Sequence, residues 1–428
     1  MASSTYMGSA VTHTNGNDAF NAALKEFYLP RLTSTINEKR VLMTRLERDT
    51  SKTDVSGRHA RLPVNIRPSQ AIGARADADG GPSLPTPQSQ TYVELIIGYA
   101  HNYGTVRVTH PVIQASRNDR GSFIRAIGSE MDGIRRDLRN DVNRQLFGDG
   151  YGVVGLMTLD SPSATELNVE PGHKIKAGML IDAYAEVSGG SATGTAMTVS
   201  AVAAETITVA SGGGSVADND RLFRASNRGN EMMGLLGIVD DGTFRGTLQG
   251  ISRSTYPEWK STVLSNSDTA RGISEDLLDN ALLQSEENSE SEISLMITSS
   301  TQWRKIGQMM TPDRRYSTSM ELPGGFTAIS WAGIPIVWDR DCPRFGMTGG
   351  GTAAAGEGAD GTDTDYLFGL DESQLAMYQL ADWDFDDTDG NVLHRRQDVA
   401  AYDATLFYYG QFGTVDASKH FVIRDLSR

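Results

Sequence analysis

The 428-residue sequence predicts an α+β fold, because helical and strand-like segments follow one another without the regular βαβ repeat of a parallel sheet. The strongest signal is one long amphipathic helix, expected over residues 116–147. The second is a pair of alternating strands, residues 61–66 and 92–97, around a tip (68–90) with almost no large apolar residue. Two strands alone bury too little surface to offset their ordering entropy, so this hairpin requires a neighbour.

The chain opens with 17 small and polar residues, which we expect to be disordered or to lie on a partner. Asp18 then precedes apolar residues at helical spacing, which end at Pro30: Phe20, Leu24, Phe27 and Tyr28. A second helical piece is expected around residues 37–48. Residues 1–57 therefore form an extended N-terminal arm.

A strand at 105–109 precedes the long helix, whose apolar residues recur every three or four positions: Phe123, Ile127, Met131, Ile134, Leu138, Val142 and Leu146. About 31 residues at 1.5 Å each give a rod of roughly 45 Å. Gly148, Asp149 and Gly150 then end the helix.

Residues 153–228 change character, with short strands between Gly/Ser turns and only two aromatic residues. Strands are expected at 174–181, 196–203, 205–210 and 221–224, which favours a small β-barrel or sandwich inserted after the helix. Beyond it we expect a helix from Ser274, a strand at 293–297, a helix capped by Ser300, two strands around Gly333 and Pro335, a Gly/Ala-rich loop at 346–361, and a tail that alternates again from Val392.

Composition indicates a soluble folded chain with more than one core, since 39% of the residues are hydrophobic and 22% are charged. We expect neither a secretion signal nor a membrane span. We expect the chain to be synthesised in the cytoplasm. Residues 1–150 carry 19 Lys and Arg against 15 Asp and Glu, whereas residues 151–428 carry 20 against 39. So acidic a body repels phosphate, which argues against tight DNA binding.

Three motifs that could carry chemistry are rejected. Gly150, Gly152 and Gly155 match the spelling of a dinucleotide fingerprint, but a helix precedes them where a strand is required. The acidic run fails the EF-hand register and is interpreted as a turn of solvated carboxylates, with an adventitious divalent cation as the alternative: Asp382, Asp384, Asp386, Asp387 and Asp389. The seven histidines are scattered without a metal-binding spacing.

Cys342 is the only cysteine, and we expect it to be a small buried hydrophobe. It could be drawn with His394 and an aspartate as a nucleophilic set, but the sequence gives no context that brings them together. We therefore expect no enzyme activity, with no catalytic, cofactor-binding or metal-binding residues and no cofactor.

The order of elements resembles the major capsid protein of tailed bacteriophages with the Hong Kong 97 fold. The most specific stretches are C-terminal: WAGIPIVWD at 331–339, then Pro343, DYLFGL at 365–370, DGNVL at 389–393, DATL at 403–406 and VIRDL at 422–426. The resemblance covers nearly the whole chain except residues 153–228.

The resemblance implies a structural head subunit that self-assembles into hexamers and pentamers of an icosahedral shell around double-stranded DNA, in a virion assembled in the host cytoplasm. It implies an N-terminal arm (1–57), an extended two-stranded loop, the E-loop, with the start of the peripheral domain (58–110), a spine helix (111–150), the inserted β-domain (151–228), a mainly axial α+β domain (229–390) and a β return (391–428). The E-loop would lie across the neighbouring subunit.

Two departures from the family pattern change the expected partners. No lysine occurs between Lys52 and Lys174, so a covalent crosslink from the E-loop is in doubt. Only 17 residues precede Asp18, so we expect scaffolding from a separate protein, besides a portal and a possible decoration protein. The insertion could decorate the shell, brace subunits, dock an accessory protein or be passive. The alternatives to a viral shell are an encapsulin-like compartment, a hydrolase using Cys342 or the aspartates, and a monomeric β-rich binding protein.

Overall fold

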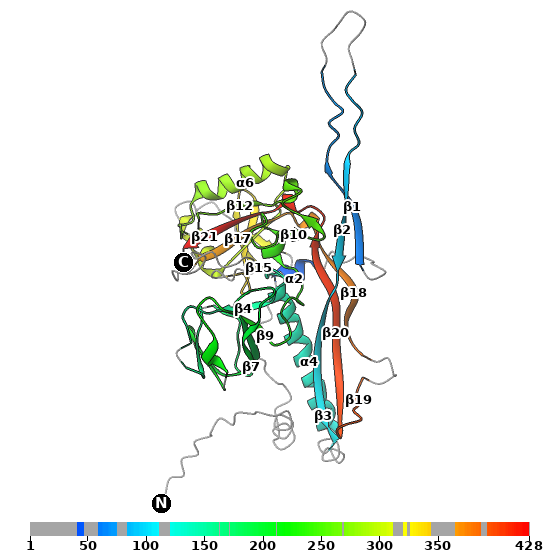
Figure 1. The fold of residues 1–428 in the computed structure, drawn as a ribbon, viewed down its shortest axis with the longest axis vertical. Coiled ribbons are helices and arrows are strands. Elements are labelled where there is room, and N and C mark those ends of the chain that lie inside the picture. The colour runs from blue at the N-terminus through cyan, green and yellow to red at the C-terminus, as the bar shows by residue number, and fades with distance from the viewer. Residues whose placement is uncertain are drawn as a thin grey trace, which may run out of the picture. The chain divides into compact units, whose positions relative to one another are not determined.

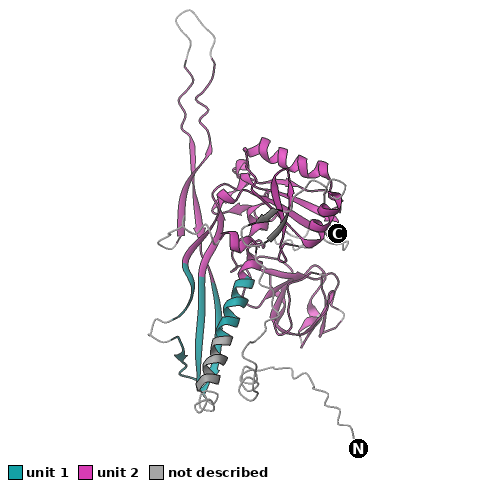
Figure 2. Cartoon of the chain, turned by 180° about the vertical axis from the view of Figure 1, so that it is seen from behind, with its two compact units in different colours: residues 1–38, 102–141, 381–408 teal, residues 39–101, 142–380, 409–428 magenta. Residues whose placement is uncertain are grey.

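The computed structural model describes residues 41–46, 59–74, 84–110, 120–161, 163–170, 172–210, 212–267, 269–310, 320–322, 326–343, 364–386 and 392–427. The chain divides into two compact units (Figure 2): unit 1 comprises residues 1–38, 102–141 and 381–408, and unit 2 comprises 39–101, 142–380 and 409–428. The boundary runs through four elements: β3 (Ala100–Thr109), α4 (Arg120–Gln145), β18 (Leu375–Phe385) and β20 (Ala401–Thr414).

Unit 1 is a helix packed along a sheet. Strand β20 lies between β18 and the short β19 (His394–Arg395), and β3 also pairs with β20. The part of α4 in unit 1 runs beside these strands (Figures 1 and 2). Their shared core consists of Leu138, Phe385, Ala404 and Leu406, with Met131, Ile134 and Trp383 packed against it. Three residues of the predicted apolar stripe, Met131, Ile134 and Leu138, thus pack against the sheet.

Helix α4 confirms the strongest sequence signal. It is predicted over 116–147 and observed from Arg120 to Gln145, while residues 116–119 lie outside the described part of the chain. Its 26 residues span roughly 39 Å. Beyond it Gly150 has φ +81°, and Asp149 Oδ1 accepts a hydrogen bond from Tyr151 N at 2.9 Å, so the predicted glycine stop is present.

Strand β18 corrects the interpretation of the acidic run. Asp382 and Asp384 are not in a turn: they are exposed on β18, where they alternate with Trp383 and Phe385. The guanidinium of Arg135 lies 5.5 Å from the centre of the Phe385 ring, and that of Arg139 lies 5.5 Å from Trp383. These contacts and the shared core place the aromatic residues of β18 against α4, while the alternating aspartates stay exposed. Residues 387–391 lie outside the described residues.

In unit 2, residues 153–224 hold a six-stranded antiparallel sheet in the order β4-β9-β6-β7-β8-β5. The strands are β4 (Val153–Leu156), β5 (Glu166–Asn168), β6 (Leu180–Tyr184), β7 (Ala192–Val202), β8 (Thr206–Val209) and β9 (Arg221–Arg224). An antiparallel bridge between Met157 and Val169 joins the two edge strands, and Glu170 N donates to Leu156 O at 2.9 Å. The sheet therefore closes on itself around a buried apolar core.

One predicted strand of this region is partly wrong. Residues 174–179 are not part of a strand, and β6 begins only at Leu180. Gly178 has φ +85°, in the left-handed region, which interrupts the strand that the apolar pattern predicts over 174–181.

The largest sheet of unit 2 has seven strands in the order β12-β21-β17-β13-β16-β15-β14. They are β12 (Thr262–Leu264), β13 (Leu295–Thr298), β14 (Met320–Leu322), β15 (Phe326–Trp331), β16 (Ile334–Trp338), β17 (Thr364–Leu370) and β21 (Phe421–Ser427). The β12/β21 and β13/β16 pairs are parallel and the other pairs are antiparallel, so the sheet is mixed.

Helices α6 (Glu275–Ser289) and α7 (Ser300–Met309) share one core with this sheet, through Leu278, Ala281 and Ile306 packed with Met296, Ile336 and Leu367. Ser274 caps α6 as predicted, since its Oγ accepts a hydrogen bond from Leu277 N at 3.2 Å. Ser299, and not Ser300, caps α7: its backbone is extended, and its Oγ accepts from Gln302 N at 3.3 Å while donating to Asp365 Oδ2 at 2.6 Å.

The described part of unit 2 also contains shorter elements. They are α2 (Val41–Leu46), α5 (Leu235–Ile238), β10 (Thr247–Leu248), β11 (Ile251–Ser252) and 3-10 turns at Gly213–Ser215, Pro257–Trp259, Glu372–Gln374 and Ala417–Lys419. Helix α2 falls within the predicted 37–48 piece; the rest of the expected arm and the 346–361 loop lie outside the described residues. Among the helices that the structure describes, none has the length and hydropathy to cross a membrane.

We expect a titration signature from His420, which is fully buried beside β21. Desolvation lowers its pKa to about 3, and the neutral ring accepts from Asp371 N through Nδ1 at 3.2 Å. In the unfolded chain the pKa returns to about 6.5, so the unfolded state binds the extra proton and stability falls as pH drops below about 6.5.

Between pH 7 and pH 5, the parent should lose about 2 kcal/mol of unfolding free energy relative to His420→Gln, because glutamine does not titrate. Urea titrations of both proteins at several pH values measure this difference. The comparison with the variant is necessary because Asp149 and Asp339, whose pKa values burial raises to about 6, oppose the histidine by gaining protons in the folded state. Parallel pH profiles for parent and variant would contradict the prediction.

Candidate assembly surface

The predicted hairpin is present in unit 2 as β1 (His59–Arg67) and β2 (Thr91–Gly98), a long two-stranded ribbon (Figure 1). The antiparallel register pairs Ala60 with Ile97 and Leu62 with Leu95, which gives the ribbon one apolar face. The opposite face is exposed, with Tyr92 at 64% and Ile96 at 39% of their full accessibility. Each strand therefore alternates as the sequence predicts.

Two groups of contacts fix this ribbon to other parts of unit 2. On the apolar face, Ala60 and Ile97 pack with Tyr378 of β18. At the edge of β2 away from β1, Ile96 N donates a hydrogen bond to Gln249 O at 2.9 Å, and the backbone of Gly250 (φ +84°) lies against the Ile96 side chain. The strand pair thus obtains part of the burial that it lacks alone.

Arg67 at the end of β1 makes the most specific anchor. Its Nε donates to Glu258 Oε1 at 2.6 Å and its Nη2 to Glu258 Oε2 at 3.1 Å, a bidentate pair, and Nη2 also donates to Thr255 O at 3.2 Å. The guanidinium lies 5.3 Å from the centre of the Tyr256 ring. The Arg67 hydrogen bonds hold the pKa of Glu258 below its usual range. This clamp marks where the ribbon leaves its supporting contacts.

Beyond Arg67, the described tip residues are 68–74 and 84–90. The two legs remain connected, because Ser69 Oγ donates to Gln88 O at 2.7 Å and Asn65 Nδ2 donates to Gln90 Oε1 at 2.8 Å. The two large apolar side chains of the tip are nonetheless open to solvent, Ile72 at 83% and Leu84 at 87%. Two large apolar side chains exposed at the end of one ribbon make the described part of the tip a candidate interaction surface.

The structure describes the surroundings of the residues that the sequence offers as chemical candidates. Cys342 is fully buried, with its Sγ 3.8 Å from Tyr366 O, as expected of a small hydrophobe. It belongs to unit 2, whereas His394 belongs to unit 1 and shares a hydrogen bond of 3.0 Å with the Asp386 carbonyl. Gly150 and Gly152 follow α4 and precede β4, the reverse of a dinucleotide-binding order. Within the described ranges, no cluster of three His, Cys, Asp or Glu could hold a metal ion.

Sequence reasoning missed two features of unit 2. The Arg67 clamp joins residues 191 positions apart, and no local pattern announces such a pair. The second feature was visible: residues 272–303 contain seven acidic residues and no Lys or Arg. In the structure all seven are exposed: Glu275, Asp276, Asp279, Glu286, Glu287, Glu290 and Glu292.

A solved phage capsid structure has a fold similar to that of this chain. The capsid asymmetric unit of cyanophage A-1(L) superposes with a TM-score of 0.55 at 12% identity, over 94% of this chain and 96% of that one. This chain has the fold of a phage capsid subunit. The superposition extends over nearly the full length of both chains, and not over one shared module.

Two further solved structures are similar to this chain with lower TM-scores. The capsid of the Myoviridae phage XM1 has a TM-score of 0.45 at 7% identity, covering 94% of this chain and 97% of that one. The holo-SrpI encapsulin complex of Synechococcus elongatus has a TM-score of 0.45 at 10% identity, covering 93% and 92%. The sequence matches no protein-family model and no curated protein.

Proposed function

We propose that this chain is the major head subunit of a tailed bacteriophage, a structural protein without enzyme activity that self-assembles into hexamers and pentamers of an icosahedral shell. The observation that carries the proposal is the chain-long likeness to a phage capsid subunit. At 12% identity the likeness is one of fold, so the function also rests on the physical properties of the chain.

The exposed tip supports self-assembly. Ile72 and Leu84 gain burial only against another molecule, and residues 68–90 correspond to the end of the extended E-loop that the resemblance implies. A neighbouring copy that covers the tip stabilises the folded chain through mass action. The E-loop is thus proposed to lie across the next subunit.

The acidic balance supports a container for DNA without specific binding. The chain has a formal net charge of -15, which is the sum of +4 in residues 1–150 and -19 in residues 151–428, and so acidic a body repels phosphate instead of holding it. We propose that the virion shell is assembled in the host cytoplasm with a separate scaffolding protein and a portal; a decoration protein is a further candidate partner.

The remaining segments receive proposed roles on the same basis. Helix α4 is the spine of a peripheral domain, and the seven-stranded sheet with α6 and α7 is the main part of the axial domain. The six-stranded barrel at 153–224 interrupts this arrangement and is proposed as an addition to the shell, decorating it, bracing it or docking an accessory protein.

Electron microscopy of particles formed by the full chain tests the proposal. Expression of the chain, with a scaffolding protein from its own genome if required, should yield closed icosahedral particles or their ring-shaped capsomers. An encapsulin-like compartment predicts shells that enclose protein cargo and no DNA. Discrete single molecules under all conditions would contradict both.

A further inference from the structure

Helix α6 carries a mixed surface where its side chains leave the core of the seven-stranded sheet. Asp279, Leu282, Leu283 and Glu286 follow at i, i+3, i+4 and i+7, so they share one side of the helix. Leu283 is 60% exposed, although the solvent face of a surface helix is normally polar. This stripe is therefore apolar at its centre and acidic at both ends.

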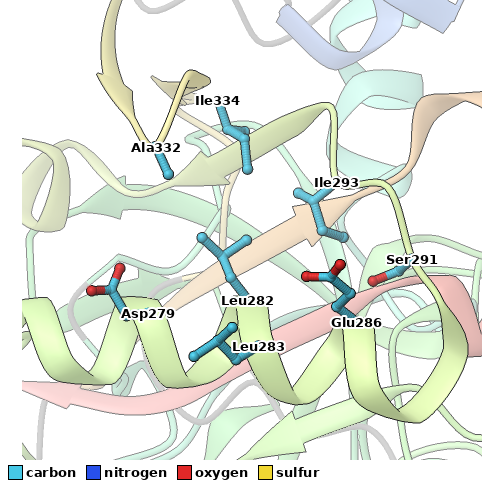
Figure 3. A pocket seen from close by; sticks show the side chains of 8 residues that line it. All are labelled: Asp279, Leu282, Leu283, Glu286, Ser291, Ile293, Ala332 and Ile334. Carbon is cyan, nitrogen blue, oxygen red and sulfur yellow. The ribbon is translucent and has the colours of Figure 1, made fainter.

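The stripe forms one side of a groove of about 470 Å³, with Ile293 and Ile334 across from the helix (Figure 3). Leu282, Ile293 and Ile334 also pack against the buried core of the seven-stranded sheet, so the fold fixes the apolar floor of the groove. The carboxylates of Asp279 and Glu286 line the same groove. The α6 groove is thus an apolar depression with negative charge at its rim.

The charges around the α6 groove oppose the stability of the helix itself. Glu286, Glu287 and Glu290 lie at its C-terminal end, where the helix macrodipole favours cations, and its last turn contains no basic residue. Residues 272–303 carry seven acidic residues without a Lys or Arg, and all seven are exposed. This arrangement costs the free helix stability, whereas a positively charged partner would be attracted by it.

Charge selects the class of occupant. The acidic rim repels the phosphates of nucleic acids and of anionic lipids, so neither suits the groove. A second copy of this chain is poorly matched, because residues 151–428 carry 20 Lys and Arg against 39 Asp and Glu. The hairpin arginines of such a copy are already engaged, Arg61 with Glu94 at 3.4 Å and Arg67 with Glu258 at 2.6 Å. A separate polypeptide with basic residues around an apolar or aromatic side chain matches both the floor and the rim.

We propose that the α6 groove is a docking site for a basic segment of a separate protein. The segment places an apolar or aromatic side chain against Leu282 and Leu283 and a Lys or Arg beside Glu286. The groove is complete within one copy of the chain, so the site does not depend on the proposed function. It assigns a partner to a surface that the E-loop tip does not form.

Peptide binding tests the docking site. The probe is a fluorescently labelled synthetic peptide in which lysines flank one tryptophan and one leucine, titrated with the full chain below its assembly concentration. Its fluorescence anisotropy should rise to saturation. The same peptide with glutamates in place of the lysines, or with serines in place of the tryptophan and leucine, should bind at least about tenfold more weakly, because it lacks the charge or the apolar surface.

Variants locate the binding in the α6 groove. Leu283→Gln removes the exposed apolar side chain without a change of charge, and Glu286→Lys reverses the charge at the rim. Each should weaken binding of the peptide about tenfold. Glu205→Lys makes the same charge change at an exposed residue of the barrel and should bind like the parent. Glu286→Lys should also raise the urea midpoint, because a cation suits the C-terminal end of a helix, and circular dichroism checks that every variant folds.

Equal affinity of the parent, Leu283→Gln and Glu286→Lys for the peptide would show that it binds elsewhere and would overturn the proposal. Weakened assembly of Leu283→Gln would show that a second copy covers the groove and would also overturn it. Failure of the proposed function looks different, because then the parent would bind the peptide through the groove and never assemble.

Discussion

A variant in which residues 68–90 are replaced by a two-residue Asn-Gly turn should fold normally and fail to assemble. Arg67 and Thr91 are already paired across the ribbon, so a tight hairpin turn can join them without disturbing β1, β2 or the Glu258 clamp. What the variant loses is the exposed apolar surface of Ile72 and Leu84.

The expected size of the effect follows from that surface. Burying each of the two side chains against a neighbour contributes about 1.5–3 kcal/mol, hence about 3–6 kcal/mol for each subunit. This corresponds to a loss of roughly a hundredfold to ten-thousandfold in the association constant of a contact. Circular dichroism and sedimentation over a range of concentrations measure folding and assembly separately.

Two controls separate a lost interface from a damaged subunit. Gln70→Ser with Gln88→Ser changes exposed polar residues of the same tip and should leave assembly unchanged. Ile134→Asp places a charge in the core beneath α4 and should damage the fold of unit 1, with a change in circular dichroism. A tip-shortened protein that assembles and resists heat like the parent would refute the proposed role of the tip.

The second large effect is expected at Asp240, which is fully buried in unit 2 between two arginines. Its Oδ1 accepts from Arg424 Nη2 at 2.7 Å and its Oδ2 from Arg253 Nη1 at 3.3 Å. Oδ2 also accepts from three backbone N–H groups, those of Gly242, Phe244 and Arg245, at 2.9–3.0 Å. One carboxylate therefore accepts the backbone hydrogen bonds of a turn and neutralises the charge of two guanidinium groups.

Asp240→Ala should destabilise unit 2 by about 3–5 kcal/mol, because it leaves buried positive charge without its partner. Arg253 is fully buried and cannot turn to water; desolvation already lowers its pKa to about 10 despite the carboxylate. Asp240→Asn, which keeps the shape and one oxygen acceptor, should cost less.

Urea denaturation below the assembly concentration measures the loss, and Asp276→Ala, the same change at an exposed carboxylate, should cost no more than about 1 kcal/mol. Equal midpoints for Asp240→Ala and Asp276→Ala would show that the buried cluster contributes nothing.

What the sequence predicts correctly is what local periodicity determines. The 3.6-residue repeat of α4 and the two-residue repeat of β1 and β2 each reflect one buried face, and Gly333 with φ +82° marks the predicted corner between β15 and β16. The predictions that fail concern the ends of strands. β6 starts six residues late because Gly178 turns the chain, and β18 extends into the aspartates because Trp383 and Phe385 are covered by a helix that is distant in sequence.

Features that join distant residues could not be predicted. Asp240 and Arg424 are 184 positions apart, and the bridge that closes the barrel depends on the register of two edge strands. Neither leaves a local signature. The acidic stretch at residues 272–303 is an intermediate case: its charge is plain in the sequence, whereas the position of Ile334 near Leu282 of α6 depends on the fold.

The central claim is that this polypeptide is completed by copies of itself, and its mass in solution tests that claim most directly. Native mass measurement of the purified full chain over a hundredfold range of concentration should show a 46.3 kDa subunit giving way to rings of five or six copies and then to shells. A single species of 46.3 kDa at every concentration, stable and well folded, would contradict the account.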